Sequence, residues 1–148
     1  MKYYLDLCCL NRPFDEQVQL RVRLETQAVL SILEACRDGK HQFASSGALE
    51  VENSLNPNPE RRNKVSVLMD QAGERVELSP KVDHRAAESL ALGFGRMDAY
   101  HLASAEIGNC DRLATTDDQF LKQAAKHAGQ LRVKVVNPVQ LIAEEGFV

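Results

Sequence analysis

The sequence contains no tryptophan, and aromatic residues make up only 5% of its 148 residues. Proteins that bind single strands by base stacking need exposed aromatic rings, so a stacking platform of that kind is not expected. A basic excess is also missing, because 18 lysine and arginine residues face 21 acidic residues, a formal net charge of -3. This balance excludes a wholly basic nucleic-acid coat, while a local basic face stays compatible with it.

Long apolar runs are absent too, and none approaches the ~18 residues of a membrane span. The apolar stretch 1–9 is short, contains Asp6 and lacks the small-residue cleavage pattern of a signal peptide. No C-x-x-C pair occurs, and two adjacent cysteines make a poor disulfide or zinc framework. The four cysteines are Cys8, Cys9, Cys36 and Cys110. We expect reduced thiols in a cytoplasmic protein without a membrane-spanning segment.

The residues that are present indicate one globular domain over 1–148, with 44% hydrophobic and 26% charged residues. Short apolar runs typical of buried strands alternate with segments of helical periodicity. The expected strands are 3–7, 41–45, 75–78, 111–115 and 131–136, and the expected helices are 18–36, 46–55, 59–72, 80–92, 97–108, 117–127 and a short one from 138. Alternation of this kind predicts an α/β fold, a three-layer αβα sandwich around a mostly parallel sheet of about five strands.

Local signals refine this outline at several boundaries. Asn58 is expected to cap a helix that has Pro59 at its first position, and Ser79 to cap the next helix. The segment 8–16 contains Asn11 and Pro13 and is predicted to be a loop.

Acidic residues follow several of the expected strands. In an open parallel sheet, ligands bind beyond the carboxyl ends of the strands. Asp6 lies near the end of the first strand, Asp117 follows the fourth, and Asp98 opens a helix after a glycine turn. Glu50 and Glu52 lie two apart on one helix and therefore point in different directions, so at most one faces a common site.

Carboxylates gathered from four elements repel one another unless a cation lies among them. Magnesium and manganese prefer oxygen ligands, and a carboxylate-held metal activates water for attack on a phosphodiester. The sequence has no P-loop, no G-x-S-x-G elbow and no dinucleotide fingerprint. The alternatives are ordinary helix caps at Asp6, Asp98 and Asp117, and surface glutamates at 50 and 52.

Five short motifs carry a family resemblance over nearly the whole chain. They are Y-L-D at 4–6, V-E-N-S at 51–54 with Ser46 before it, D-A-Y-H-L-A at 98–103, T-T-D-D-Q-F at 115–120 and V-V-N-P at 135–138. With them the chain resembles the PIN-domain ribonucleases, of the kind found as VapC-type toxins in bacterial toxin–antitoxin pairs. The third and fourth motifs, at this separation and in this strand order, are fairly specific.

The resemblance implies that four acids bind one or two Mg²⁺ or Mn²⁺ ions, and it favours Glu52 over Glu50. These acids are Asp6, Glu52, Asp98 and Asp117. The implied activity is cleavage of single-stranded or structured RNA by a metal-activated water, with an antitoxin protein as partner and a homodimer as the assembly. Side chains expected to support the acids are Asn11, His101, Thr115 and Asp118.

One departure concerns the residues after the first acid, where many members carry Thr, Ser or Asn and this chain has Leu7 and Cys8. Asn11 and Arg12 could replace the missing polar contacts. An RNA substrate also needs basic residues around the acidic site. The first candidates for this basic rim are Arg12, Arg61, Arg62 and Arg96, with Arg21, Arg23 and Lys64 as further ones.

Three other interpretations stay open. A phosphatase of the haloacid-dehalogenase type would use Asp6 as nucleophile, but it needs a second acid two residues later, where Cys8 stands. Arg96 and His101 match an R-x4-H pattern of some all-helical ribonucleases, against which the five expected strands argue. The third interpretation is a degenerate PIN fold that only binds RNA or protein.

Overall fold

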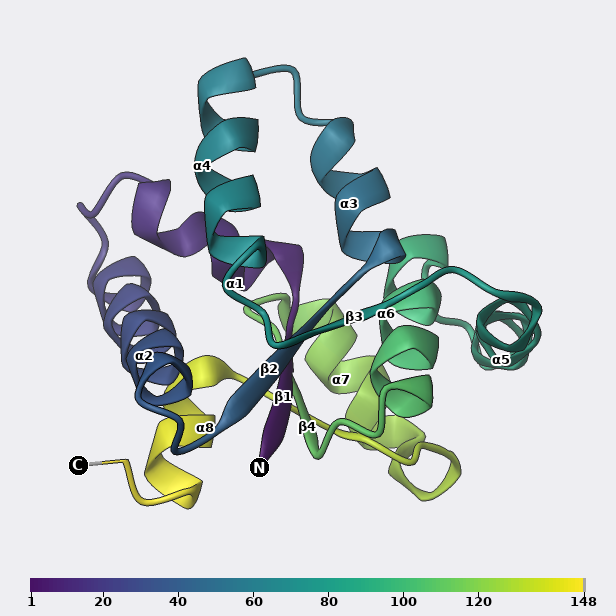
Figure 1. Cartoon of the computed structure of the whole chain (residues 1–148). Coiled ribbons are helices and arrows are strands. Elements are labelled where there is room, and N and C mark those ends of the chain that lie inside the picture. Colours follow the sequence, from purple (N-terminus) through teal and green to yellow (C-terminus); the bar gives the residue numbers. More distant parts are fainter. Residues whose placement is uncertain (148) are drawn as a thin grey trace.

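The computed structural model describes residues 1–147. Its centre is a five-stranded, all-parallel sheet with the strand order β3-β2-β1-β4-β5 (Figure 1). The strands are β1 (Lys2–Leu5), β2 (Gln42–Ser46), β3 (Glu74–Val76), β4 (Arg112–Ala114) and β5 (Lys134–Val136). The α-helices are α1 (Leu7–Asn11), α2 (Leu20–Arg37), α3 (Gly47–Ser54), α4 (Pro59–Met69), α5 (Pro80–Ala91), α6 (Arg96–Ile107), α7 (Asp118–Lys126) and α8 (Pro138–Glu144). Two 3₁₀ turns, η1 (Arg12–Phe14) and η2 (Ala128–Gln130), complete the chain.

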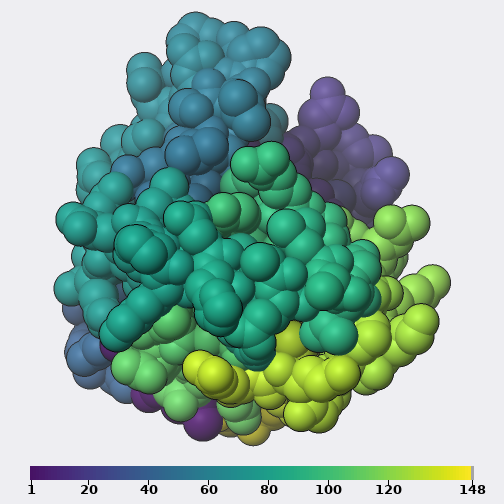
Figure 2. All heavy atoms as spheres, turned by 90° about the vertical axis from the view of Figure 1, so that its right-hand side faces the viewer, coloured from purple at the N-terminus to yellow at the C-terminus, as the bar shows by residue number. Residues whose placement is uncertain are grey.

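Helices cover both faces of the sheet, as the αβα prediction requires. In Figure 1, α2 and α8 lie on one side of the sheet and α5 and α6 on the other. The α3–α4 hairpin stands beyond the carboxyl ends of β1 and β2, and Figure 2 shows it rising above α5 from the side. The predicted fold class is therefore confirmed.

The middle of the sheet is apolar because both of its faces are covered. Tyr3, Tyr4 and Leu5 of β1 are fully buried, as is Leu113 of β4. Strands buried on two faces are expected to be continuous apolar runs of this kind. The register pairs Tyr4 with Ala44 of β2 and with Leu113, so the carboxyl ends of these strands lie level with one another.

The predicted loop over 8–16 is wrong, because α1 and η1 occupy most of it. The Asp6 carboxylate accepts the Leu7 N–H and starts α1 immediately after β1. Pro13 lies in the first turn of η1, where its missing N–H costs nothing. Asn11 therefore ends α1, and Pro13 lies in the short helix that follows it directly.

Most other boundaries fall within two residues of the prediction. Asn58 caps α4 by accepting the N–H groups of Glu60 and Arg61, and Ser79 caps α5 through the Val82 N–H. The last strand is shorter than expected and begins at Lys134. Within residues 1–147, no helix is both long enough and apolar enough to cross a membrane.

Candidate metal site

Asp6 lies where β1 ends and α1 begins, and the residue is 6% exposed. Its Oδ1 accepts the Leu7 N–H at 2.8 Å, and its Oδ2 accepts the Thr115 hydroxyl at 2.7 Å. Thr115 directly follows β4, which pairs in parallel with β1. The sheet register thus places this acid and this hydroxyl side by side and fixes the carboxylate.

Glu52 of α3 contacts the buried imidazole of His101, which also lies close to Asp6. His101 Nε2 lies 3.0 Å from Glu52 Oε1 and 3.6 Å from Asp6 Oδ1. On the other side of the ring, Nδ1 lies 2.7 Å from the Tyr4 hydroxyl. Burial lowers the pKa of His101, but the hydrogen bond to Glu52 and the nearby carboxylate charges outweigh it and raise that pKa overall.

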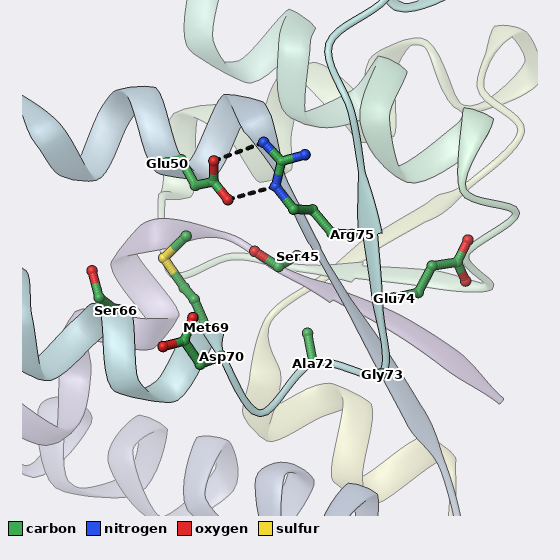
Figure 3. A pocket seen from close by; sticks show the side chains of 9 residues that line it. All are labelled: Ser45, Glu50, Ser66, Met69, Asp70, Ala72, Gly73, Glu74 and Arg75. Carbon is green, nitrogen blue, oxygen red and sulfur yellow. Dashed lines mark hydrogen bonds and ion pairs between the residues drawn. The ribbon is translucent and has the colours of Figure 1, made fainter.

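Glu50 points elsewhere. It forms a two-pronged ion pair with Arg75, at 2.6 and 2.8 Å, beside a cavity of about 520 Å³ (Figure 3). Met69 and Gly73 also line this cavity. Of the two glutamates on α3, the structure brings Glu52 to Asp6 and His101, whereas Glu50 pairs with β3.

Asp98 lies half-buried in the first turn of α6. Burial raises its pKa, and the charges of Asp6 and Asp117 add to that effect, so the pKa rises to about 7. Asp117 caps α7 by accepting the N–H groups of Gln119 and Phe120 through Oδ1. A cavity of about 340 Å³ runs beside Asp98 and Asp117.

These residues fit a divalent cation. Asp6, Glu52 and His101 each offer one ligand atom, and the three atoms lie within 4.8 Å of one another. Carboxylate oxygens suit Mg²⁺ and Mn²⁺, and an imidazole nitrogen is compatible with Mn²⁺. Burial first, and then the charges of Asp6 and Asp117, raise the pKa of Asp98, and a cation bound here would offset both effects.

No family model and no curated protein matches the chain, whereas solved structures do. The structure of FitAcB from Neisseria gonorrhoeae aligns with 92% of this chain and 97% of its own, at 16% identity and a TM-score of 0.56. VapBC2 from Rickettsia felis, bound to a DNA fragment from its promoter, aligns over 93% and 98%, at 15% identity and a TM-score of 0.60. The chain has a VapC-like PIN fold. Its sequence resemblance to that family and its structure thus agree on the fold.

Within this PIN-like fold, Cys8 takes part in the site in a way that the sequence did not reveal. Its Sγ lies 3.4 Å from Asp6 Oδ2 and 3.4 Å from Thr115 Oγ1, and it accepts the Thr116 N–H at 3.3 Å. The thiol therefore makes polar contacts beside the first acid. The signal available was its position close after Asp6, where many family members carry a polar residue.

Two of the expected supporting residues point away from Asp6. Asn11 donates to the Leu7 carbonyl of its own helix at 3.1 Å. Asp118 binds both terminal nitrogens of Arg21, at 2.8 and 2.9 Å, and thereby ties α7 to α2. Thr115 and His101, in contrast, contact the predicted acids directly.

Most of the arginines proposed to contact RNA already have partners. Arg12 binds Glu25 and Asp15, each at 2.9 Å, and Arg61 binds Asp15 at 2.6 Å. Arg62 donates to the Asn56 carbonyl at 2.5 Å. Within residues 1–147, Arg96 makes no side-chain hydrogen bond or ion pair, and it lies exposed two positions before Asp98.

Proposed function

We propose that the chain, as one domain over 1–148, is an endoribonuclease that depends on Mg²⁺ or Mn²⁺. The observation that carries this proposal is the gathering of acids from separate elements at the carboxyl edge of the sheet. Asp6 and Glu52 meet at His101. Asp98 lies near them, and burial together with the charges of Asp6, Asp117 and Glu52 raises its pKa. In the PIN-like fold this edge is the place where a ligand is expected.

The four acids, Asp6, Glu52, Asp98 and Asp117, would hold the metal, and the rest of the site positions them. Thr115 orients Asp6, and His101 orients Glu52. Asp117 is held by its contacts with the first N–H groups of α7, which leaves its second oxygen free of those bonds. When bound, a divalent ion supplies an activated water and stabilises the leaving oxygen.

RNA brings phosphate charge to an acidic edge, so the substrate needs cations from the protein as well. Among the arginines predicted to contact RNA, Arg96 is the best placed for this, because it is exposed, unpaired in the described residues and close to Asp98. Arg12, Arg61 and Arg62 support the surrounding structure through their bonds to acids and carbonyls. We assign the first phosphate contact to Arg96.

The partners we propose follow the same likeness. VapBC2 was solved bound to a fragment of promoter DNA, and the sequence resembles VapC-type toxins. We therefore propose that this chain is the toxin of a toxin–antitoxin pair, forms a homodimer and acts in the cytoplasm. Co-purification with the product of a neighbouring gene for a small DNA-binding protein would test the antitoxin.

The activity is tested by incubating purified protein with RNA in Mg²⁺ or Mn²⁺, in excess chelator, and as the Asp98→Asn variant. We expect cleavage only by the wild-type protein with metal. Equal cleavage by the variant would refute the site, and cleavage in chelator would refute the metal dependence. Aspartyl phosphate at Asp6 would instead indicate a phosphatase, and RNA binding without cleavage would indicate a binding module.

A further inference from the structure

The nitrogen of a buried histidine lies among the oxygens expected to bind the metal. His101 Nε2 is 3.0 Å from Glu52 Oε1 and 3.6 Å from Asp6 Oδ1. Two ligands held about 2.1 Å from one ion lie about 3.0 Å apart at a right angle and about 3.4 Å apart at a tetrahedral angle. Both distances from Nε2 therefore fall close to those between ligands of a single ion, and all three ligand atoms lie within 4.8 Å of one another.

The other ring nitrogen has a fixed partner. Nδ1 lies 2.7 Å from the Tyr4 hydroxyl, which lies 2.6 Å from Ser46 Oγ. Ser46 Oγ in turn accepts the Leu49 N–H at 3.0 Å. When the Tyr4 hydroxyl donates to Ser46, its oxygen accepts the hydrogen of Nδ1. In the metal-free protein Nε2–H donates to Glu52, and a bound ion would replace that proton, which passes to solvent, and take the Nε2 lone pair. Metal-bound histidines commonly donate their second nitrogen to such a partner.

This chain of contacts is buried along its length. Tyr4, Ser46 and His101 are all 0% exposed, so water does not compete for their hydrogen bonds. The ring is thus held in one orientation by β1, β2 and α3 before any ion binds. Such rigid support is what a ligand needs, and a solvated histidine on a surface would lack it.

We infer that His101 is a direct nitrogen ligand of the metal, together with Asp6 and Glu52, so that the site is mixed rather than purely carboxylate. The inference rests on the proposed metal dependence and specifies the ion. Imidazole suits Mn²⁺ and other transition metals better than Mg²⁺, which favours oxygen ligands. The site therefore selects Mn²⁺ over Mg²⁺ more strongly than a four-carboxylate site does.

Pulsed electron paramagnetic resonance of the Mn²⁺-loaded full chain tests this directly, because a coordinated imidazole nitrogen couples to the manganese electron spin. We expect nitrogen coupling in the wild-type protein, loss of it in His101→Gln, and retention in His84→Gln, whose side chain is exposed on α5. If the buried substitution prevents folding, absence of coupling in the wild-type protein still overturns the inference, and coupling that is retained in each of His41→Gln, His84→Gln and His127→Gln assigns it to His101.

Calorimetric titration supplies a second readout. We expect His101→Gln to lower the Mn²⁺ affinity at least about tenfold and the Mg²⁺ affinity less than about threefold. Tyr4→Phe should keep the nitrogen coupling but weaken Mn²⁺ binding, because Nδ1 loses its partner. Equal losses for both metals in His101→Gln would indicate a merely structural role and overturn the inference.

The two proposals fail in different ways. Mn²⁺ binding without nitrogen coupling, together with metal-dependent RNA cleavage, would refute the role of His101 and leave the ribonuclease intact. Absence of Mn²⁺ and Mg²⁺ binding would refute both. Nitrogen coupling that persists in His101→Gln would place the nitrogen ligand elsewhere and also overturn the inference.

Discussion

Two glutamates on one short helix have different tasks, and their surroundings explain why. Glu52 contacts a buried imidazole near Asp6, whereas Glu50 lies in an exposed ion pair with Arg75. The hydrogen bond from Arg75 lowers the pKa of Glu50 and keeps it ionised without a metal. The side of α3 from which each side chain projects therefore decides which of the two carboxylates is available to a cation.

This difference gives a matched pair of variants. We expect Glu52→Gln to lower Mn²⁺ affinity at least about tenfold, because an amide is a weaker ligand and no longer balances His101. Glu50→Gln should change it less than about twofold and cost no more than ~1 kcal/mol of stability, since exposed ion pairs contribute little. Calorimetric titration of both variants checks the prediction, and similar losses in both would contradict it.

Thr115 joins the ends of two strands through one hydroxyl. Its Oγ1 donates to Asp6 Oδ2 and accepts the Asp117 N–H at 3.1 Å, and the side chain is fully buried. Thr115→Val should lower the free energy of unfolding by ~1–3 kcal/mol, because both groups lose their partner. Urea denaturation measures this, with Thr115→Ser as the control that keeps the hydroxyl. A loss in the serine variant as large as in the valine variant would exclude the hydroxyl as the cause.

At the scale of elements, the sequence predicted the alternation of strands and helices because each signal is local. Asn58 with Pro59 and Ser79 with Pro80 mark helix starts within a few residues, and the structure has both caps. The short helix α1 was missed because its cap, Asp6, directly follows β1 and lies inside the segment 3–7 that was expected to be a strand. A cap that follows a strand without any loop gives no separate signal for a helix start.

Contacts between distant segments were not predictable from the same local signals. Arg21 and Asp118 stand 97 positions apart, and Arg61 and Asp15 stand 46 apart. Such pairs depend on how α2, α4 and α7 are placed around the sheet. Spacing and resemblance therefore led to the four acids as a prediction, but they indicated neither which arginines have partners nor that Cys8 contacts Asp6.

Gly108, at the end of α6, packs closely against Val76 of β3, and a substitution there tests this packing. A β-carbon added at Gly108 would lie 2.7 Å from Val76 Cγ2 and 3.2 Å from the Ser104 carbonyl oxygen. Gly108→Ala should therefore destabilise the protein by ~1–3 kcal/mol through overpacking. At Gly129 no atom lies within 4 Å of an added β-carbon, so Gly129→Ala should stay within ~0.5 kcal/mol. Thermal unfolding of both variants measures the difference. If the two variants were equally stable, the structure around Gly108 would accommodate the added methyl group without cost.

At the scale of the whole molecule, the acidic edge links stability to pH and to metal. Burial and the nearby carboxylates raise the pKa of Asp98 from 3.8 to about 7, so between these values the folded state holds a proton that the unfolded state has lost. Stability then falls as pH rises across this window. The raised pKa of His101 acts in the same direction, because its stabilising proton is lost as pH increases. The contribution of these two groups should therefore make the metal-free protein less stable at pH 8 than at pH 5.

Other groups also titrate, so the prediction concerns the difference between the wild-type protein and Asp98→Asn in chelator. The variant should be more stable than the wild-type protein at pH 8, and the advantage should shrink at pH 5, where the wild-type Asp98 is protonated. Adding Mn²⁺ at pH 8 should remove the advantage, because the ion compensates the carboxylate charge and binds only the folded state. If the stability of the two proteins changed with pH in the same way, the raised pKa of Asp98 would be contradicted.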